Sequence, residues 1–251
     1  MRQPTTAVVV AAAAVLVGAC GGSNPSGPAS SSTSATTTTS TRPPVAQPAL
    51  AGLLLTTAEI DGVLGVTGTS TKSKADKLPD DSTKPFAQGW KWPADCLFAF
   101  DPGEAPVYAN SGYTAANGED DVASLPPSSN DIDPEVTQVV VLFPTADQAN
   151  AFFSTSAQAW PACANRQFTA PGDADNPEVA VKIGPVNNAN STLTTVMTLT
   201  LSNGSTTITG ACQRALTVRN NVAIDVSACR NDPGDVGVKI ANQIAGKVDK
   251  Q

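Results

Sequence analysis

The residues CQRALTVRNNVAIDVSAC, numbered 212–229, predict a β-hairpin with a cysteine in each strand. Apolar and β-branched residues favour strands over residues 206–218 and 222–228, and Asn220-Asn221 between them tolerates the positive φ angles of a tight turn. Cys212 and Cys229 stand eight residues before and after that pair. A hairpin therefore places them opposite each other, where a disulfide can join them.

Further strand patterns precede this hairpin in the chain. Asn203-Gly204 is a strong hairpin signal, because both residues tolerate positive φ angles. Residues 67–88 are polar without periodicity, and residues 117–135 are acidic and rich in turn formers, so we expect loops in both stretches. The predicted strands cover residues 107–115, 136–143, 179–186 and 192–201.

Helical patterns occur at three places. Thr56, followed three residues later by Glu59, forms a capping box before a short helix that Gly65 is placed to end. Apolar residues at helical spacing over 145–160 predict the main core-facing helix, and an i, i+4 apolar stripe predicts a last helix over 235–248. We expect an α+β fold, an antiparallel β-sheet with two to three packing helices, stapled by two disulfides.

Residues 1–19 are typical of a lipoprotein signal peptide. Arg2 supplies a positive start, an apolar run covers residues 7–17, and Val17-Gly18-Ala19 places small residues before a cysteine. The alternatives are a transmembrane anchor or an ordinary secretory signal, but the run is shorter than the roughly 20 residues that span a bilayer. We expect cleavage before Cys20 and attachment of lipid, including palmitate, to its thiol.

Two segments follow the predicted cleavage site. Residues 20–47 consist mostly of Gly, Ser, Thr, Pro and Ala and cannot form a packed core, so we expect a lipid anchor and a disordered linker, with O-glycosylation as an open question. Residues 48–251 have the size of a single domain. The predicted location is the extracytoplasmic face of the cell membrane.

The remaining cysteines are even in number, which suits an oxidising compartment. Beside the pair Cys212 and Cys229 we favour a bond between Cys96 and Cys163. The alternative, a four-thiolate zinc site, lacks any C-x-x-C spacing. No metal or cofactor is expected.

Composition narrows the classes of function. The chain has no histidine, which removes Ser-His-Asp and Cys-His nucleophiles and histidine-based metal sites. A net charge of −7 without clustered Lys or Arg argues against nucleic acid as a partner. The run Asp131-Ile132-Asp133-Pro134-Glu135 lacks the glycine and spacing of a calcium loop. Carboxylates crowd residues 119–135, which leaves glycoside hydrolysis as an alternative, although a solvated loop is the simpler interpretation.

Five stretches together carry a family resemblance: residues 54–60 with Leu64-Gly65, residues 108–113, residues 143–149, residues 160–163 and residues 220–229. They resemble the extracellular sensor domain of PknH-type mycobacterial Ser/Thr kinases, a domain that also occurs detached as a lipoprotein. The resemblance covers about residues 50–250 and implies an antiparallel sheet with flanking helices, the disulfide pairing given above and a broad cleft for an undefined ligand. We expect neither the kinase domain nor the transmembrane helix of that pattern, so direct signalling across the membrane is not expected.

Five residues are candidates for ligand contact: Tyr113, Trp160, Arg214, Asn221 and Asp225. The two aromatic residues offer large contact areas with a polar edge, but they could equally pack in the core. Asp225 stands in an apolar strand and needs a partner, such as Arg214, so an internal ion pair is the simpler interpretation of both charges.

We therefore expect a cell-envelope lipoprotein whose domain binds a ligand or partner in a cleft without catalysis. The ligand would be a small molecule, a lipid or a glycan, and the partner an envelope protein. The alternatives are a carboxylate-dependent hydrolase of envelope glycans or esters and a structural or adhesin-like surface protein. A cleft with converging acids would favour the hydrolase, whereas apolar and aromatic walls would favour a carrier or sensor.

Overall fold

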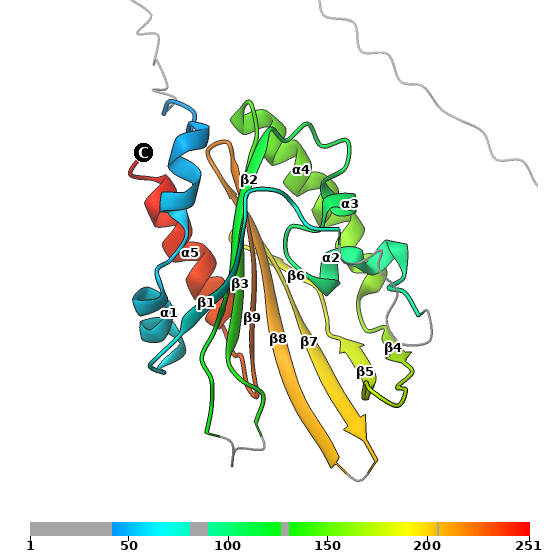
Figure 1. The fold of residues 1–251 in the computed structure, drawn as a ribbon. Helices are drawn as coiled ribbons and strands as arrows, with labels where there is room; N and C mark the ends of the chain where they lie inside the picture. Colours follow the sequence, from blue (N-terminus) through cyan, green and yellow to red (C-terminus); the bar gives the residue numbers. More distant parts are fainter. Residues whose placement is uncertain (1–41, 81–89, 127–130, 205) are drawn as a thin grey trace, which may run out of the picture. The chain divides into compact units, whose positions relative to one another are not determined.

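A nine-stranded antiparallel β-sheet forms the centre of the chain in the computed structural model, which describes residues 42–80, 90–126, 131–204 and 206–251 (Figure 1). These residues belong to one compact unit, Thr41–Gln251. The strand order is β1-β2-β3-β9-β8-β7-β5-β4, and β6 pairs with β7 outside this path. The predicted α+β fold is confirmed.

The strands differ widely in length. The hairpin β7–β8 provides the longest pair, and β8 and β9 lie in the middle of the sheet. The bounds are β1 (Ser70–Ala75), β2 (Ala115–Val122), β3 (Glu135–Leu142), β4 (Gln167–Ala170), β5 (Glu178–Ile183), β6 (Asn187–Ala189), β7 (Thr192–Asn203), β8 (Thr206–Arg219) and β9 (Val222–Arg230).

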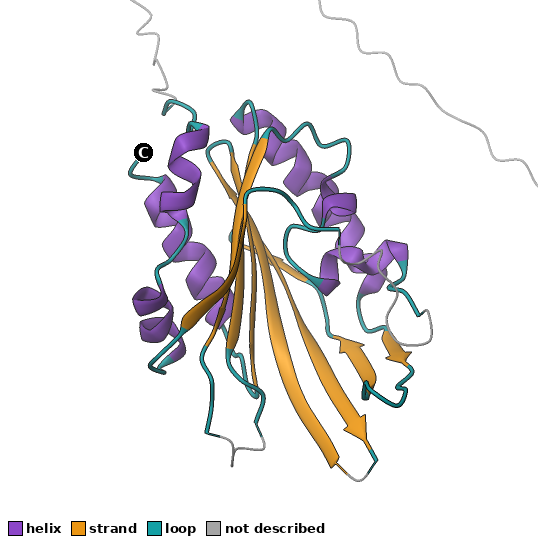
Figure 2. Ribbon diagram, viewed as in Figure 1, coloured by secondary structure: helices purple, strands orange, loops and turns teal. Residues whose placement is uncertain are grey.

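Helices cover both faces of the sheet (Figure 2). The three predicted helices are present, and the first has the expected capping box at Thr56 and Glu59, with Gly65 in the left-handed conformation at its end. None of the helices within the described ranges has the length and apolar character needed to cross a membrane. The bounds are η1 (Gln47–Leu53), α1 (Thr57–Leu64), η3 (Ala94–Cys96), α2 (Leu97–Phe100), α3 (Ala105–Tyr108), α4 (Ala146–Ala159), η4 (Trp160–Cys163) and α5 (Val236–Val248).

Two hydrophobic cores result from the alternation of side chains along the central strands. In β3, Val136 and Val140 pack with η1, α1 and α5, whereas Val139 and Val141 pack on the other face with α2, α3 and α4. Strands β3 and β9 are buried on both faces over most of their length, which explains why apolar residues predominate in them without strict alternation.

Both disulfides join the predicted partners. Cys212 lies directly opposite Cys229 in the β8–β9 ladder, and the two sulfur atoms are bonded. The second bond links Cys96, next to α2, to Cys163 at the end of η4, with Cα atoms 5.4 Å apart. All four thiols are therefore engaged, and none is left to ligate zinc.

The strand predicted over residues 107–115 is wrong. Residues 105–108 form the short helix α3 with Pro106 in its first turn, where a missing N–H is tolerated. Asn110 and Gly112 then have φ angles of 62° and 80°, which form a turn instead of extended backbone. The alternation of apolar residues over this stretch does not reflect a strand.

Two stretches that were expected to be loops contain strands. Strand β1 lies within residues 67–88, most of β2 falls in residues 117–135, and the two strands pair with each other. β1 is an exposed edge strand, so it lacks the apolar alternation that marks a half-buried strand. The acids of β2 are satisfied across the ladder, where Thr71 and Ser73 donate to Asp121 and Asp120, and Lys74 pairs with Glu119.

The domain makes ordered contacts before residue 48. Val45, which the sequence assigns to the linker, is buried, and both its N–H and its C=O bind the side chain of Asn221 at 2.7 Å and 3.1 Å. Arg42 forms an ion pair with Asp249 near the C-terminus. The predicted signal peptide, the lipidation site at Cys20 and most of the linker lie outside the described residues.

Replacement of both Cys212 and Cys229 by Ser should lower the free energy of unfolding by roughly 2–5 kcal/mol, because the reduced chain gains conformational freedom. Urea denaturation followed by circular dichroism measures the change. Reduction of the wild-type chain should destabilise it at least as much as this substitution. An unchanged urea midpoint in the variant would contradict a stabilising bond in the central hairpin.

Candidate functional site

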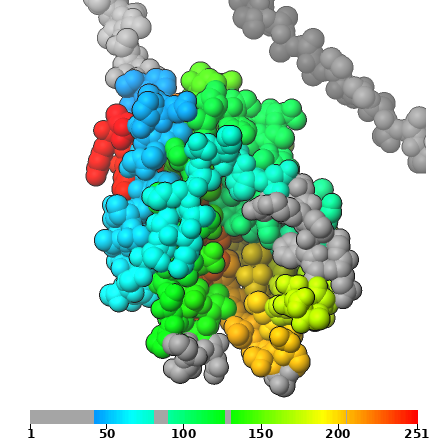
Figure 3. All heavy atoms as spheres, viewed as in Figure 1, coloured from blue at the N-terminus to red at the C-terminus, as the bar shows by residue number. Residues whose placement is uncertain are grey.

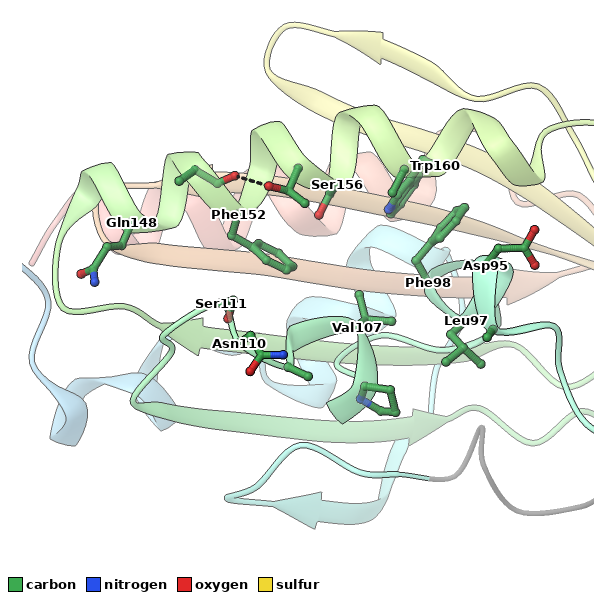
Figure 4. A pocket seen from close by; sticks show the side chains of 16 residues that line it. Asp95, Leu97, Phe98, Val107, Asn110, Ser111, Gln148, Phe152, Ser156 and Trp160 are labelled. Carbon is green, nitrogen blue, oxygen red and sulfur yellow. Dashed lines mark hydrogen bonds between the residues drawn. The ribbon is translucent and has the colours of Figure 1, made fainter.

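A cavity, here called the α4 pocket, lies between helix α4 and the α2–α3 segment (Figure 4). Its volume is about 430 Å³, which falls within the range of small-molecule sites. Most of its lining atoms are apolar. The lining residues are Ala94, Asp95, Leu97, Phe98, Pro106, Val107, Ala109, Asn110, Ser111, Gln148, Ala151, Phe152, Thr155, Ser156, Ala159 and Trp160.

One wall of the α4 pocket is a single face of α4. Gln148, Phe152 and Ser156 line it at intervals of four residues, and Trp160 continues the row into η4. Thr145 caps the start of the helix, and its hydroxyl accepts a hydrogen bond from the backbone N–H of Gln148. Helix geometry therefore places an amide at one end of the pocket and an indole at the other.

Stacked aromatic rings form the apolar end of the α4 pocket. The rings of Phe98 and Trp160 are nearly parallel, with centroids 4.9 Å apart. Phe152 stacks on Tyr108, with centroids 4.3 Å apart, and its ring points from α4 toward the opposite wall in Figure 4. The Cys96–Cys163 disulfide ties together the two segments that carry Phe98 and Trp160.

The opposite end of the α4 pocket is polar. The turn after α3 presents Asn110 and Ser111 on the side where Gln148 lies (Figure 4). The hydroxyl oxygen of Ser111 is buried and has no hydrogen-bond partner within the described part of the chain. A buried hydroxyl without a partner is unfavourable, and a polar atom of a ligand could satisfy it.

A buried ion pair joins the sheet to the α2–α3 segment. The guanidinium of Arg214 on β8 donates to the carboxylate of Asp225 on β9 at 2.8 Å, and the two side chains are only 1 % and 5 % exposed. Arg214 also donates to the carbonyl of Phe98 at 3.0 Å, so the pair positions an aromatic residue of the pocket wall.

Asp225 completes the same network from the other side. Its second oxygen accepts hydrogen bonds from the hydroxyl of Tyr108 and the backbone N–H of Gly103, each at 3.0 Å. Gly103 has a φ angle of 72°, and a Cβ atom there would come within 2.8 Å of Val139. Burial raises the pKa of Tyr108 well above its usual value, and the adjacent Asp225 adds to this effect, so the phenol stays protonated and donates.

The structure brings only one of the five predicted contact residues to the α4 pocket. Trp160 lines it, whereas Tyr113 is half-buried outside the lining and packs edge-on against Tyr108. Arg214 and Asp225 form the internal ion pair described above, and the side chain of Asn221 binds the backbone of Val45. These three polar side chains therefore have structural partners.

Sequence reasoning missed the polar end of the pocket, because Asn110 and Ser111 were assigned to a strand. The signal was present: Asn110-Ser111-Gly112 is a turn sequence, in which Asn and Gly adopt the left-handed conformation at little cost. Leu97 and Phe98 gave no comparable signal, because a short aromatic run is typical of any core.

The α4 pocket offers binding groups and a single carboxylate. That carboxylate, Asp95, forms an exposed ion pair with Arg166. Glycoside hydrolysis by the usual route needs two carboxyl groups about 5–10 Å apart across the substrate. The lining is instead typical of a site that takes an apolar body with one polar group.

Comparisons with known proteins place this geometry in context. Residues 45–247 match the family model of the PknH-like extracellular domain. The serine/threonine-protein kinase PknH of Mycobacterium tuberculosis (strain ATCC 25618 / H37Rv) is 34% identical over 205 residues, which are 80% of this chain and 30% of the kinase. PknH of Mycobacterium bovis is 34% identical over 208 residues, 83% of this chain and 32% of the kinase. The chain thus spans about a third of the length of these kinases.

A solved structure has the same architecture. The crystal structure of the extracellular domain of PknH from Mycobacterium tuberculosis superposes with a TM-score of 0.68 at 31% sequence identity. The match covers 83% of this chain and 99% of that chain.

Asp225→Asn should destabilise the domain by about 3–5 kcal/mol, because it leaves the buried guanidinium of Arg214 without its counter-charge. Urea denaturation at neutral pH measures the loss. Asp249→Asn is the matched control, since Asp249 pairs with Arg42 on the surface with both side chains 47% exposed, and we expect a change of about 0.5 kcal/mol or less. Equal effects of the two substitutions would contradict the central role of the buried pair.

Proposed function

The chain belongs to the family of PknH-like extracellular domains, and we propose that it is a cell-envelope lipoprotein that binds a small amphiphilic ligand in the α4 pocket without catalysis. The ligand would have an apolar body and one hydrogen-bonding group. Lipids and acylated or aromatic metabolites of the envelope have this chemistry.

The α4 pocket itself carries the proposal. The stacked rings of Phe98 and Trp160 at one end suit an apolar body, and Asn110, Ser111 and Gln148 at the other suit a polar group. The buried hydroxyl of Ser111 lacks a partner among the described residues. We propose that the polar group of the ligand binds there.

We favour binding over hydrolysis because the α4 pocket has one carboxylate, and that group is paired with Arg166. The relatives are kinases of which this chain matches about a third of the length. We therefore do not extend kinase activity to it. Capture, buffering or presentation of the ligand at the membrane surface, including presentation to an envelope protein, is consistent with a domain held on a lipid.

The lipid anchor rests on the sequence. Arg2, the apolar run over residues 7–17 and the small residues before Cys20 together match the requirements of lipoprotein processing. The polar linker after Cys20 would hold the domain off the membrane, with a random-coil reach of roughly 30 Å. A single acyl chain gives only marginal membrane binding, so we expect more than one chain on Cys20.

The neutral fluorescent probe N-phenyl-1-naphthylamine should bind in the α4 pocket and gain fluorescence. Ala151→Phe, which adds a ring to the lining, should weaken binding by about tenfold or more, because the ring occupies part of the cavity. Titration of the oxidised full chain measures both affinities.

The matched control for this titration is Gln158→Phe, which adds the same ring at an exposed position of α4 outside the pocket lining. It should leave the affinity within about twofold of the wild type. Failure of the wild type to bind the probe, or equal weakening by the two substitutions, would count against the α4 pocket as a binding site.

Cys20→Ala should abolish lipidation and release the protein from the membrane fraction, because the thiol is the attachment point. Intact-mass measurement of the mature protein from a mycobacterial host reads the acyl mass directly. Cys163→Ala is a useful comparison, since it removes another cysteine and should leave the acyl mass in place. A wild-type mature protein without acyl mass would refute the anchor.

A further inference from the structure

A second cavity, here called the sheet pocket, lies over the sheet at its central hairpin. Figure 3 shows the molecule hollowed between the green surface of β3 and the yellow surface of β5 and β7, with orange atoms of the β8–β9 region at the bottom. Its volume is about 200 Å³. It shares no lining residue with the α4 pocket, and Cys212 and Cys229 contribute to its wall.

The segment of residues 90–101 separates the two pockets. Leu97 and Phe98 face the α4 pocket, whereas Trp92, Phe100 and Asp101 line the sheet pocket. The Cys96–Cys163 disulfide and the bonds from Arg214 to the Phe98 carbonyl fix this segment in place.

Aromatic rings cluster at the sheet pocket. The rings of Trp90 and Trp92 meet edge to face at 5.6 Å and 67°, and Trp92 meets Phe100 at 5.0 Å and 50°. The faces of such rings carry negative potential and attract cations. Rings set at steep angles to one another can present more than one face to a bound cation.

Two carboxyl groups, Asp101 and Glu135, line the sheet pocket together with these rings. Among the residues that the structure describes, neither forms an ion pair, and no Lys or Arg lines the cavity. The pKa of Asp101 is raised to about 7, mainly by burial; Arg214 opposes this rise, and the nearby Asp120, Glu104 and Glu135 contribute to it. Burial, with Asp120 and Asp133, likewise raises the pKa of Glu135.

Among the described residues, Arg214 is the cation that acts on Asp101, and it is already engaged. Arg214 donates to Asp225, to the Phe98 carbonyl and to the Val226 carbonyl. The sheet pocket thus combines aromatic faces with carboxyl groups that lack a counter-charge among the described residues. With a pKa raised to about 7, Asp101 binds a proton below that pH in place of a counter-ion.

We propose that the sheet pocket is a second binding site, which takes a small organic ammonium ion between its aromatic rings and its two carboxylates. The volume is below the roughly 300–1,000 Å³ of sites for drug-sized ligands, so a single headgroup fits better than an extended molecule. The buried indole N–H of Trp92 has no acceptor within the described ranges. An oxygen atom close to the ammonium group of the ligand would supply one.

The pH dependence of this binding follows from Asp101. A bound cation favours the carboxylate and displaces the proton, so affinity should rise with pH. For one group with a pKa of about 7, the affinity should be about tenfold higher at pH 8 than at pH 6.

Choline is the probe for this site, and 3,3-dimethyl-1-butanol is its uncharged analogue of the same shape. The indole N–H signals of the three tryptophans in a ¹⁵N-labelled, oxidised full chain report on both pockets, because Trp90 and Trp92 line the sheet pocket and Trp160 lines the α4 pocket. Choline should shift the signals of Trp90 and Trp92 saturably, with the stated pH dependence, and leave Trp160 in place. The alcohol should bind at least about tenfold more weakly.

Asp101→Asn should weaken choline binding by about tenfold or more and remove the pH dependence, since the displaced proton is lost with the carboxylate. Asp95→Asn is the matched control, because it removes a carboxylate from the α4 pocket and should leave choline affinity unchanged. Two results with the wild type alone would overturn the proposal. One is equal affinity for choline and the alcohol, and the other is a choline-induced shift of the Trp160 signal only. The probe titration of the α4 pocket is independent of these outcomes.

Discussion

The ion pair between Arg214 and Asp225 is the constraint on which the rest of the domain depends. It crosses the two central strands, and its remaining hydrogen bonds reach the Phe98 carbonyl, the Tyr108 hydroxyl and the Gly103 N–H. A buried charge pair tolerates little movement, because either charge alone is costly in an apolar interior. The segments that form one wall of the α4 pocket are thereby held on the sheet by electrostatics, since α2 and α3 are too short to pack firmly by themselves.

Both cavities depend on the same short segment. Residues on one side of it line the α4 pocket and residues on the other line the sheet pocket, while the Cys96–Cys163 bond fastens its middle. Phe98 and Phe100 are only two residues apart, so the conformation of this segment determines the lining of both cavities.

The sequence predicted those elements whose burial shows directly in the order of apolar and polar residues. Strands β3 and β7–β9, helices α1, α4 and α5 and the Cys212–Cys229 bond follow from apolar periodicity, turn residues and the spacing of those two cysteines. The Cys96–Cys163 bond joins the two cysteines that remain once that pair is assigned. It did not predict β1 and β2, because these strands pair at an exposed edge of the sheet through polar side chains, and their sequences therefore resemble those of loops. For the site, the sequence identified Trp160 but assigned Asn110 and Ser111 to a strand. The sequence shows Asp225 as a charged residue in an apolar strand, with Arg214 as a candidate partner. Only the structure shows that the hydrogen bonds of this pair support one wall of the α4 pocket.

The ends of the described unit lie close together. Asn221, in the turn between β8 and β9, holds Val45 through its backbone, and Arg42 reaches Asp249 near the last residue of the chain. The first and last described residues therefore lie at one pole of the domain. Termini at one pole suit a domain that is joined to other segments, because such an addition need not pass through the sheet. The kinases that contain a similar stretch within a much longer chain are consistent with this modularity.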